Sequence, residues 1–496
     1  MKLHYLLPIC ALALAAQQTA PAAQQATPAA QQYPPIGLDN SPGTQDVLRR
    51  ISNLGPNDVP DLPLKADHDY ANTPTDYEPF GGVKPYKEFF LTQVEYTGPG
   101  RAEPEPGPDL KSVRIGFIGP ISSTVSASTG GKSHEEALGK EMLQGAQLAV
   151  EQANARGGYV KRNIPFEIDI VNDNGLWGST GNEVVNLAYK RPTWAILGTI
   201  DSANSHVAIR VALKSEIFMM NSGDTDPTYI ETNIPWTGRC IGDDRQQGYL
   251  LVDYMIRKMG YKHIGIIRAS NRYGRFGVRE VRDSARRLGH PIAIEMAYKV
   301  YGNDFSLQIQ RLREANVDAI VHWGDARESA LVLNQLRALG MNQPYFTSDR
   351  SVSEEFTKLA GANADGVISG FAWNPERQDP HLEEFRKAFI ARFNAEPGTF
   401  GAHAYDGMNL LLWATNNAGL NRAKIRDLIA TRATPWPGVT GDIPLSSAID
   451  DAGEVFLARF DKDRWTYHSR KDLQIPRGEI PTRERVIRGN DQASAK

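Results

Sequence analysis

A regular alternation of short apolar runs and longer amphipathic segments begins near Ser112 and continues to about Leu339. Residues 113–118 (VRIGFI) have the composition of a short buried strand, and residues 135–155 carry apolar side chains at helical spacing. Further strands are expected at 166–171, 195–197, 217–220, 263–268, 292–298 and 319–322, and helices from about 182 and about 205 and at 247–258, 276–288, 305–314 and 329–339. This pattern predicts an α/β protein with parallel sheets covered on both faces. A different segment at 236–245 divides the alternation into two runs, which predicts two lobes.

The N-terminal region has the features of an exported protein. Lys2 precedes an apolar run over residues 6–16 that contains the A-x-A arrangement of a signal-peptidase site, so we expect a secretory signal at 1–16 and a periplasmic location. Residues 17–32 are almost entirely Ala, Gln, Pro and Thr, and prolines and glycines recur through 33–110. We therefore expect a disordered tether followed by an extended arm over 17–110, whose role the sequence does not reveal.

Charge and cysteine content exclude several classes of protein. Lys and Arg total 55 against 58 for Asp and Glu, so the chain has no basic excess that would indicate binding to nucleic acid or to an anionic membrane. Cys10 lies in the predicted signal, where the bulky Ile9 before it argues against lipid attachment. Cys240 is then alone, and we expect it to be a small buried thiol without a disulfide partner.

The loops that follow the predicted strands hold the candidate ligand-binding residues, because ligands of open parallel sheets lie beyond the carboxyl ends of the strands. Ser202 and Ser205 stand where a helix is expected to begin, so their hydroxyls and the helix N-terminus could hold a carboxylate. Ordinary N-capping is the alternative for both serines. Gly223 allows close backbone approach and Thr225 adds a hydroxyl, although a Gly-Asp turn before Pro227 is also an ordinary loop.

A carboxylate follows a strand in the second run. Asp349 could bind an ammonium group, and its alternative is a solvated loop residue. An anion-binding loop in one lobe that faces this carboxylate in the other lobe would suit a zwitterion. The pairing therefore favours an amino acid as the ligand.

Catalytic and metal-binding motifs do not support an enzyme. Ser202 and His206 are four residues apart, but no G-x-S-x-G sequence surrounds the serine and no carboxylate can be assigned to orient the histidine, which we expect to be exposed on its helix. The H-E-x-x-H, P-loop and G-x-G-x-x-G patterns and Cys/His clusters are also lacking. We expect no catalytic activity, no cofactor and no metal.

The loop motifs, in their order, resemble the type I periplasmic solute-binding proteins of ABC importers, in the leucine/isoleucine/valine-binding group. The resemblance extends from Val113 to about Trp465 and rests on residues 115–120, 145–146, 154–158, 198–205, 221–227, 271–274, 304–306 with Leu312, and 404–407. It implies two doubly wound lobes joined by three crossings near 236–244, 371–376 and 438–444, with a ligand held in the cleft as the lobes close. The implied boundaries are 111–238 and 375–438 for lobe 1, 239–374 and 439–470 for lobe 2, and a C-terminal tail at 471–496.

The resemblance also implies roles for individual residues. The positions of Ser202, Gly223 and Thr225 would hold a ligand carboxylate, Asp349 would hold its amine, and the ring of Tyr273 would be an aromatic wall of the cleft. A core aromatic is the alternative for Tyr273.

Several residues depart from the family pattern. Asp349 is shorter than the glutamate of close relatives, and the loop 121–132 is long and lacks an aromatic side chain. Asp325 and Ala326 stand where relatives often have a tyrosine, and Asp201, Asp224 and Asp325 add negative charge that Arg327 and Arg350 could offset. A simple leucine pocket is doubtful, and a polar or cationic ligand is possible.

Two functions follow from these expectations. The first is an extracytoplasmic receptor that delivers a small amino acid, amide or related polar solute to an ABC permease by cleft closure. The second is a ligand-sensing or docking module of an exported complex that uses the same fold without transport. Ligand-induced stabilisation would distinguish a competent cleft from a degenerate one.

Overall fold

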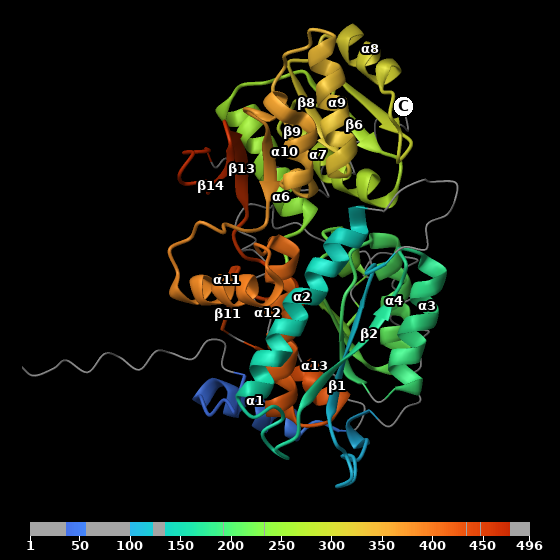
Figure 1. Ribbon diagram of the computed structural model, residues 1–496, viewed down its shortest axis with the longest axis vertical. Helices are drawn as coiled ribbons and strands as arrows, with labels where there is room; N and C mark the ends of the chain where they lie inside the picture. Colours follow the sequence, from blue (N-terminus) through green and yellow to red (C-terminus); the bar gives the residue numbers. More distant parts are fainter. Residues whose placement is uncertain are drawn as a thin grey trace, which may run out of the picture. The chain divides into compact units, whose positions relative to one another are not determined.

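The computed structural model describes residues 36–55, 100–122 and 134–476, apart from the single positions 192, 233, 433 and 447. The predicted signal 1–16, the tether and much of the arm, most of the loop 121–132 and the tail beyond 476 lie outside the described residues. Two sheets dominate the described part, each with its own helices (Figure 1).

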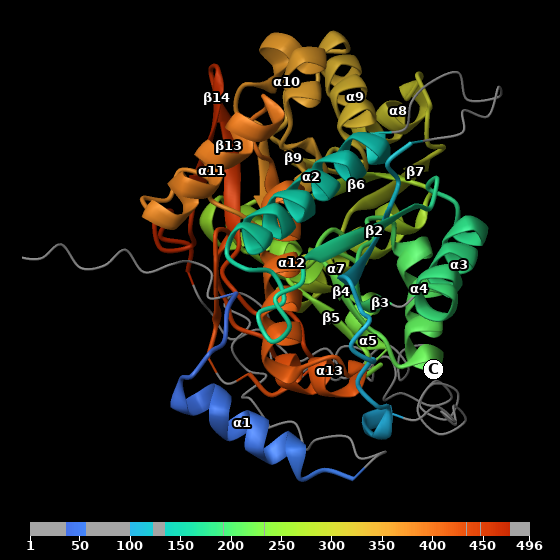
Figure 2. The ribbon, with the colours of Figure 1, turned by 60° about the horizontal axis from the view of Figure 1, so that its bottom comes forward.

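The first lobe is built on a five-stranded parallel sheet in the order β2-β1-β3-β4-β5. Its strands are β1 (Val113–Gly119), β2 (Phe166–Asn172), β3 (Thr193–Leu197), β4 (Phe218–Asn221) and β5 (Thr237–Arg239). The helices of this lobe are α2 (His134–Ala155), α3 (Trp177–Val185) with a π-helical turn at Asn186–Lys190, α4 (Ser202–Ser215), α5 (Thr228–Glu231), α11 (Pro380–Phe393), α12 (Thr399–Ala418) and α13 (Arg422–Ala430). Helices α2 and α12 lie side by side although more than half of the chain's described length separates them (Figures 1 and 2).

The second lobe has a seven-stranded sheet in the order β14-β13-β10-β9-β8-β6-β7. Its strands are β6 (Ile264–Ala269), β7 (Ile294–Tyr298), β8 (Ala319–Trp323), β9 (Tyr345–Thr347), β10 (Ile368–Phe371), β13 (Phe456–Asp461) and β14 (Arg464–His468), the last two antiparallel. The helices are α6 (Asp244–Asp253) with a π-helical continuation at Tyr254–Lys258, α7 (Arg272–Arg287), α8 (Ser306–Glu314), α9 (Ala326–Ala338) and α10 (Glu354–Ala360), with short 3₁₀ turns at Asp349–Ser351 and Gly361–Ala364. The two sheets confirm the predicted α/β class and its division into two lobes.

Three segments lead from one lobe to the other. The first joins β5 to α6, the second joins β10 to α11, and the third follows the hairpin of β11 (Trp436–Gly438) and β12 (Gly441–Ile443) before β13. Arg239, at the end of β5, ties the first and third segments together because its fully buried guanidinium binds Asp450 and Asp243. These ties hold the crossings in register beside the loops that follow β4.

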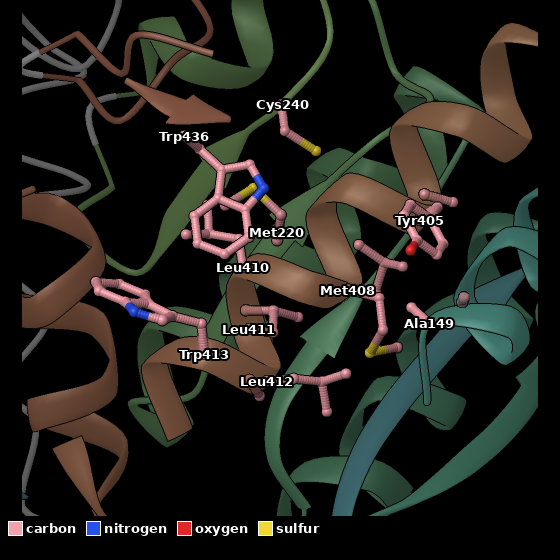
Figure 3. Close-up of a cluster of buried hydrophobic side chains, with 14 of the residues drawn as sticks. Ala149, Met220, Cys240, Tyr405, Met408, Leu410, Leu411, Leu412, Trp413 and Trp436 are labelled. Atoms are coloured by element: carbon pink, nitrogen blue, oxygen red, sulfur yellow. The ribbon is translucent and has the colours of Figure 1, made fainter. Parts of the chain in front are cut away.

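The core of the first lobe is closed by side chains from distant parts of the chain. Figure 3 shows Trp436 of the β11 hairpin over Met220 of β4 and Leu410 of α12, with Cys240 close by. Cys240 is buried and free, which confirms the expectation of a small buried thiol. Removing this much apolar surface from water stabilises the sheet edge that carries the loops described below.

The arm departs from the extended conformation that was expected. Residues Pro42–Ser52 form a helix, α1, with Ser41 as its N-cap and Pro42 in the first turn, and Val47 and Ile51 are buried in the first-lobe core. The extended conformation was expected because prolines recur along the arm. A proline in the first turn of a helix is nevertheless compatible with the helix, as Pro42 shows in α1. A 3₁₀ turn at Gly100–Ala102 precedes β1. None of the helices in the described ranges is long and apolar enough to cross a membrane.

Candidate functional site

Helix α4 begins three residues earlier than the sequence indicated, at Ser202. The cap is Asp201, whose carboxylate accepts from the backbone N–H groups of Ala203 and Asn204 at 2.8 and 3.2 Å. The N-cap of α4 is therefore Asp201, and neither Ser202 nor Ser205 caps the helix. Ser202 is buried and its hydroxyl donates instead to Oδ1 of Asp224 at 3.0 Å.

Ser205 and Gly223 are engaged by the protein interior. The Ser205 hydroxyl lies 2.7 Å from the Thr199 hydroxyl and accepts from the Asn221 amide at 3.3 Å. Gly223 packs so closely that a Cβ atom there would lie 2.8 Å from Sδ of Met142. Gly223 therefore allows close approach to buried side chains of the first lobe, such as Met142.

Tyr273 and Asp349 meet in the second lobe. Asp349 follows β9, is only 3 % exposed, and accepts from the Tyr273 hydroxyl at 2.6 Å and from the Arg350 N–H at 2.9 Å. The solvated alternative for Asp349 is therefore wrong. Tyr273 is the second residue of α7 and is buried, with the Arg350 guanidinium 3.8 Å from the centre of its ring. Its ring belongs to the core of this lobe, which is the alternative considered for it, and its hydroxyl reaches the strand-end carboxylate; its role as a wall of the ligand site stays a prediction.

Thr225 contacts the second lobe directly. Its carbonyl oxygen accepts from the backbone N–H of Asp244, the first residue of α6, at 2.8 Å. The Asp244 carboxylate is fully buried and is influenced both by the Thr225 hydroxyl and by the charge of Asp349. Asp244 therefore links the loop after β4 to the loop after β9, and it brings the environments of Thr225 and Asp349 together.

A second set of contacts joins the two lobes near Thr225 and Asp244. Arg272 of α7 donates to Asp226 at 2.9 Å, to Thr228 at 2.6 Å and to Nε2 of His206 at 3.0 Å. His206 was expected to be exposed on α4, but it is half-buried by this contact. Because an arginine only donates, Nε2 of His206 accepts and the ring is neutral, consistent with burial that lowers its pKa to about 4.

The carboxylates of this region have raised pKa values. Burial, followed by the charge of Asp226, raises the pKa of Asp224 to about 7, and burial followed by the charge of Asp349 raises that of Asp244 well above its usual range. Burial also raises the pKa of Asp349, although the Tyr273 hydroxyl and Arg350 oppose the shift. The fold therefore disfavours the charged forms of these three carboxyl groups.

The arginines near the site already have carboxylate partners. Arg350 pairs with Asp325 at 2.9 Å, as the sequence suggested, whereas Arg327 turns to Glu328 and Asn303. Arg272 pairs with Asp226 and Arg239 with Asp450.

Two site residues were not anticipated, Asp244 and Arg272. The adjacent pair Asp243-Asp244 offered a signal, since only one of two carboxylates can cap a helix, and Asp243 does so with Gln246 in a capping box. Arg272 carried no signal of its own.

Across the described ranges no group of three or more His, Cys, Asp or Glu side chains is arranged to hold a metal ion.

Comparisons with known proteins agree with this architecture. Residues 112–452 match the periplasmic binding protein family. Leu/Ile/Val-binding protein homolog 2 of Brucella abortus is 26 % identical over 360 residues, covering 72 % of this chain and 92 % of that protein. The leucine-, isoleucine-, valine-, threonine- and alanine-binding protein of Pseudomonas aeruginosa is 23 % identical over 72 % of this chain and 90 % of its own.

Solved structures show the same fold. The branched-chain amino acid transporter substrate-binding protein LivJ of Streptococcus pneumoniae, in complex with isoleucine, aligns over 72 % of this chain and 99 % of its own with a TM-score of 0.65 and 22 % identity. A solute-binding protein of an ABC transporter from R. palustris, in complex with benzoate, covers 72 % of this chain and 96 % of its own with a TM-score of 0.63 and 16 % identity.

These relatives and neighbours are solute-binding proteins rather than enzymes, which confirms the expectation that the chain has no catalytic role. Their names also confirm the resemblance to the leucine/isoleucine/valine-binding group. With the family model matched over residues 112–452, which is more than half of the chain, and with both sheets in place, this chain belongs to the periplasmic binding protein family.

Proposed function

We propose that this protein is an extracytoplasmic receptor that binds a small, amine-bearing, amino-acid-like solute between its lobes and delivers it to an ABC permease. The observation that carries the proposal is the meeting of strand-end loops from both sheets. Thr225 of the first lobe bonds to Asp244 of the second, and the carboxylate of Asp349 lies within the influence of the Asp244 charge. A solute held at such a meeting point is bound only when the lobes are closed.

The residues proposed to contact the solute fall into two groups. Asp349 is the partner for an ammonium group, oriented by the Tyr273 hydroxyl, and Thr225 with Ser202 lines the opposite side. Ser205 and Gly223 support this loop from the interior rather than facing the solute. Recognition of an amine by a buried carboxylate is strong because few water molecules compete for it.

The fold alone does not select the solute. The structural neighbours include one protein in complex with isoleucine and another in complex with benzoate, so ligands of different charge occupy proteins of this shape. The amine is inferred from Asp349, and export from the signal predicted at 1–16.

A thermal-shift screen tests the proposal. The mature chain is heated with amino acids, amides, polyamines and small carboxylates, and an amine-bearing solute is expected to raise the melting temperature in proportion to RT ln(1 + [L]/Kd). If no amine in the screen stabilises the protein, the receptor function is abandoned. Stabilisation would also exclude the alternative of a docking module with a degenerate cleft.

A further inference from the structure

Three buried carboxyl groups near the meeting of the two lobes have no ion-pair partner within the described residues. Asp224, Asp244 and Asp349 are each at most 3 % exposed. The neighbouring arginines, 239, 245, 272 and 350, pair with six other carboxylates, those of Asp450, Asp243, Glu231, Glu280, Asp226 and Asp325. A carboxylate removed from water without a countercharge is costly, so a fold that concentrates three of them has a use for added positive charge.

Asp244 is the clearest of the three. Neither of its carboxylate oxygens has a hydrogen-bond partner of ordinary geometry within the described residues, although both are fully buried. The neighbouring Asp243 caps α6, so the Asp244 carboxyl group is not needed to cap that helix. Its carboxylate lies close enough to Asp349 and to the Thr225 hydroxyl for both to affect its protonation. A buried acid of this kind, on a residue whose backbone N–H binds the loop after β4, lacks a partner that a ligand could supply.

Asp224 adds a carboxyl group on the first-lobe side of the proposed site, where Ser202 lies. The Ser202 hydroxyl, which the sequence analysis assigned to a ligand carboxylate, donates to Oδ1 of Asp224, and Oδ2 of Asp224 is buried without a hydrogen-bond partner. The loop that was expected to bind a ligand carboxylate therefore already holds a carboxyl group of the protein itself. An ammonium group fits this side better than a carboxylate does.

We infer that the ligand of this site is a small organic molecule with two ammonium groups, called a dication below, with one ammonium group held by Asp349 and the second held by Asp244 beside the loop that contains Asp224. The inference rests on the proposed receptor function and narrows its ligand to a diamine or a basic amino acid. A dication would supply the missing hydrogen-bond donors and balance the excess charge in one step.

Calorimetric titration tests this assignment. The probes are putrescine, cadaverine, L-lysine and L-leucine, measured against the wild type and the variants Asp244→Asn and Asp224→Asn. Each substitution keeps the shape of the side chain, and because it removes an unbalanced buried charge it is expected to preserve or raise the melting temperature of the ligand-free protein. Asp463→Asn, at an exposed position, makes the same change in net charge and serves as the matched control.

The expected result has two parts. At least one dication binds more tightly than L-leucine to the wild type, and Asp244→Asn weakens it by at least about 30-fold, the lower end for loss of a buried charge partner, while Asp463→Asn leaves it unchanged. If L-leucine binds as tightly as every dication, or if Asp244→Asn leaves dication affinity unchanged, the inference is overturned and the receptor function stands. Absence of binding by every amine would instead overturn the receptor function. Calcium or magnesium replacing the amines, with the same loss in Asp244→Asn, would show a metal site and overturn the inference.

Discussion

Arg239 and Asp450, 211 residues apart in the chain, form a two-point ion pair in which Nε and one terminal nitrogen of the guanidinium bind the two carboxylate oxygens at 2.7 and 2.9 Å. Arg239 is fully buried and also donates to the carbonyl oxygens of Asp224 and Asp226. One side chain therefore joins two of the crossings between the lobes and fixes the loop that contains Asp224 and Asp226.

We expect Arg239→Met to lower the free energy of unfolding by about 3–5 kcal/mol, because it leaves Asp450 and Asp243 buried without their countercharge. Urea unfolding followed by circular dichroism measures the change. The control is Arg386→Met, which breaks an exposed pair with Glu396 and should cost less than about 1 kcal/mol. Equal losses in the two variants would contradict the structural role of Arg239.

Replacing Asp349 tests the amine-binding carboxylate. Asp349→Ala should weaken the best binder among L-leucine, L-lysine and putrescine by about 2–5 kcal/mol, since it removes a desolvated charge partner. Tyr273→Phe, which keeps the ring and removes only the hydroxyl bonded to Asp349, should weaken the same probe by a smaller amount of about 1–2 kcal/mol. Calorimetric affinities decide the matter, and an unchanged affinity in Asp349→Ala would remove the amine assignment while leaving the fold.

The contacts of Arg272 predict a link between lobe closure and affinity. Arg272→Met removes the bonds to Asp226, Thr228 and His206 across the lobes, so the closed form should lose about 1–2 kcal/mol and ligand affinity should fall roughly 5- to 30-fold. Small-angle X-ray scattering should give a larger radius of gyration for the ligand-free variant. Arg275→Met, on the exposed side of the same helix, should change neither quantity. A variant at Arg272 that stays as compact and binds as tightly as the wild type would exclude a closing role.

The raised carboxyl pKa values predict the pH dependence of stability. Above the usual value of 3.8, the folded protein holds protons on Asp224 and Asp244 that the unfolded chain releases, because burial raises the pKa of Asp224 to about 7 and that of Asp244 well above its usual range. Their contribution to stability is therefore complete at low pH; the part due to Asp224 is lost as the pH rises through about 7, and the part due to Asp244 is lost as the pH rises through its raised pKa. The groups that face them include Asp226, Asp243, Arg239 and Asp349.

Melting temperatures of the ligand-free protein measured from about pH 5 to about pH 8 should consequently fall, and they should fall less steeply in Asp244→Asn. The comparison with the variant is needed because Asp406, Asp451 and Asp173 are also buried acids with raised pKa values. A cationic ligand should bind more tightly at the higher pH, because it competes with these protons. Identical pH profiles for wild type and variant would contradict the assigned shift.

The alternation of apolar strands and amphipathic helices was sufficient to predict the α/β class and the two sheets. Strand β1 was expected at 113–118 and is found at Val113–Gly119, and helix α2 was expected at 135–155 and is found at His134–Ala155. These features depend on side-chain periodicity within a short window, and each is readable in a local sequence. Helix α4 was expected from about 205 and begins at Ser202, because Asp201, Ser202 and Ser205 are all good capping residues and only the backbone conformation chooses among them.

The sequence by itself determined which residues follow the strands, and with them the loops from which a cleft is built. Only the tertiary structure decided what each side chain does there: that Asp224 takes the Ser202 hydroxyl, that Ser205 and Gly223 turn inward, and that Asp244 and Asp349 affect each other across more than a hundred residues of chain. The physical reason is that hydrogen-bond partners and buried charge are set by the meeting of distant segments, whereas periodicity reports only which face of a segment is apolar.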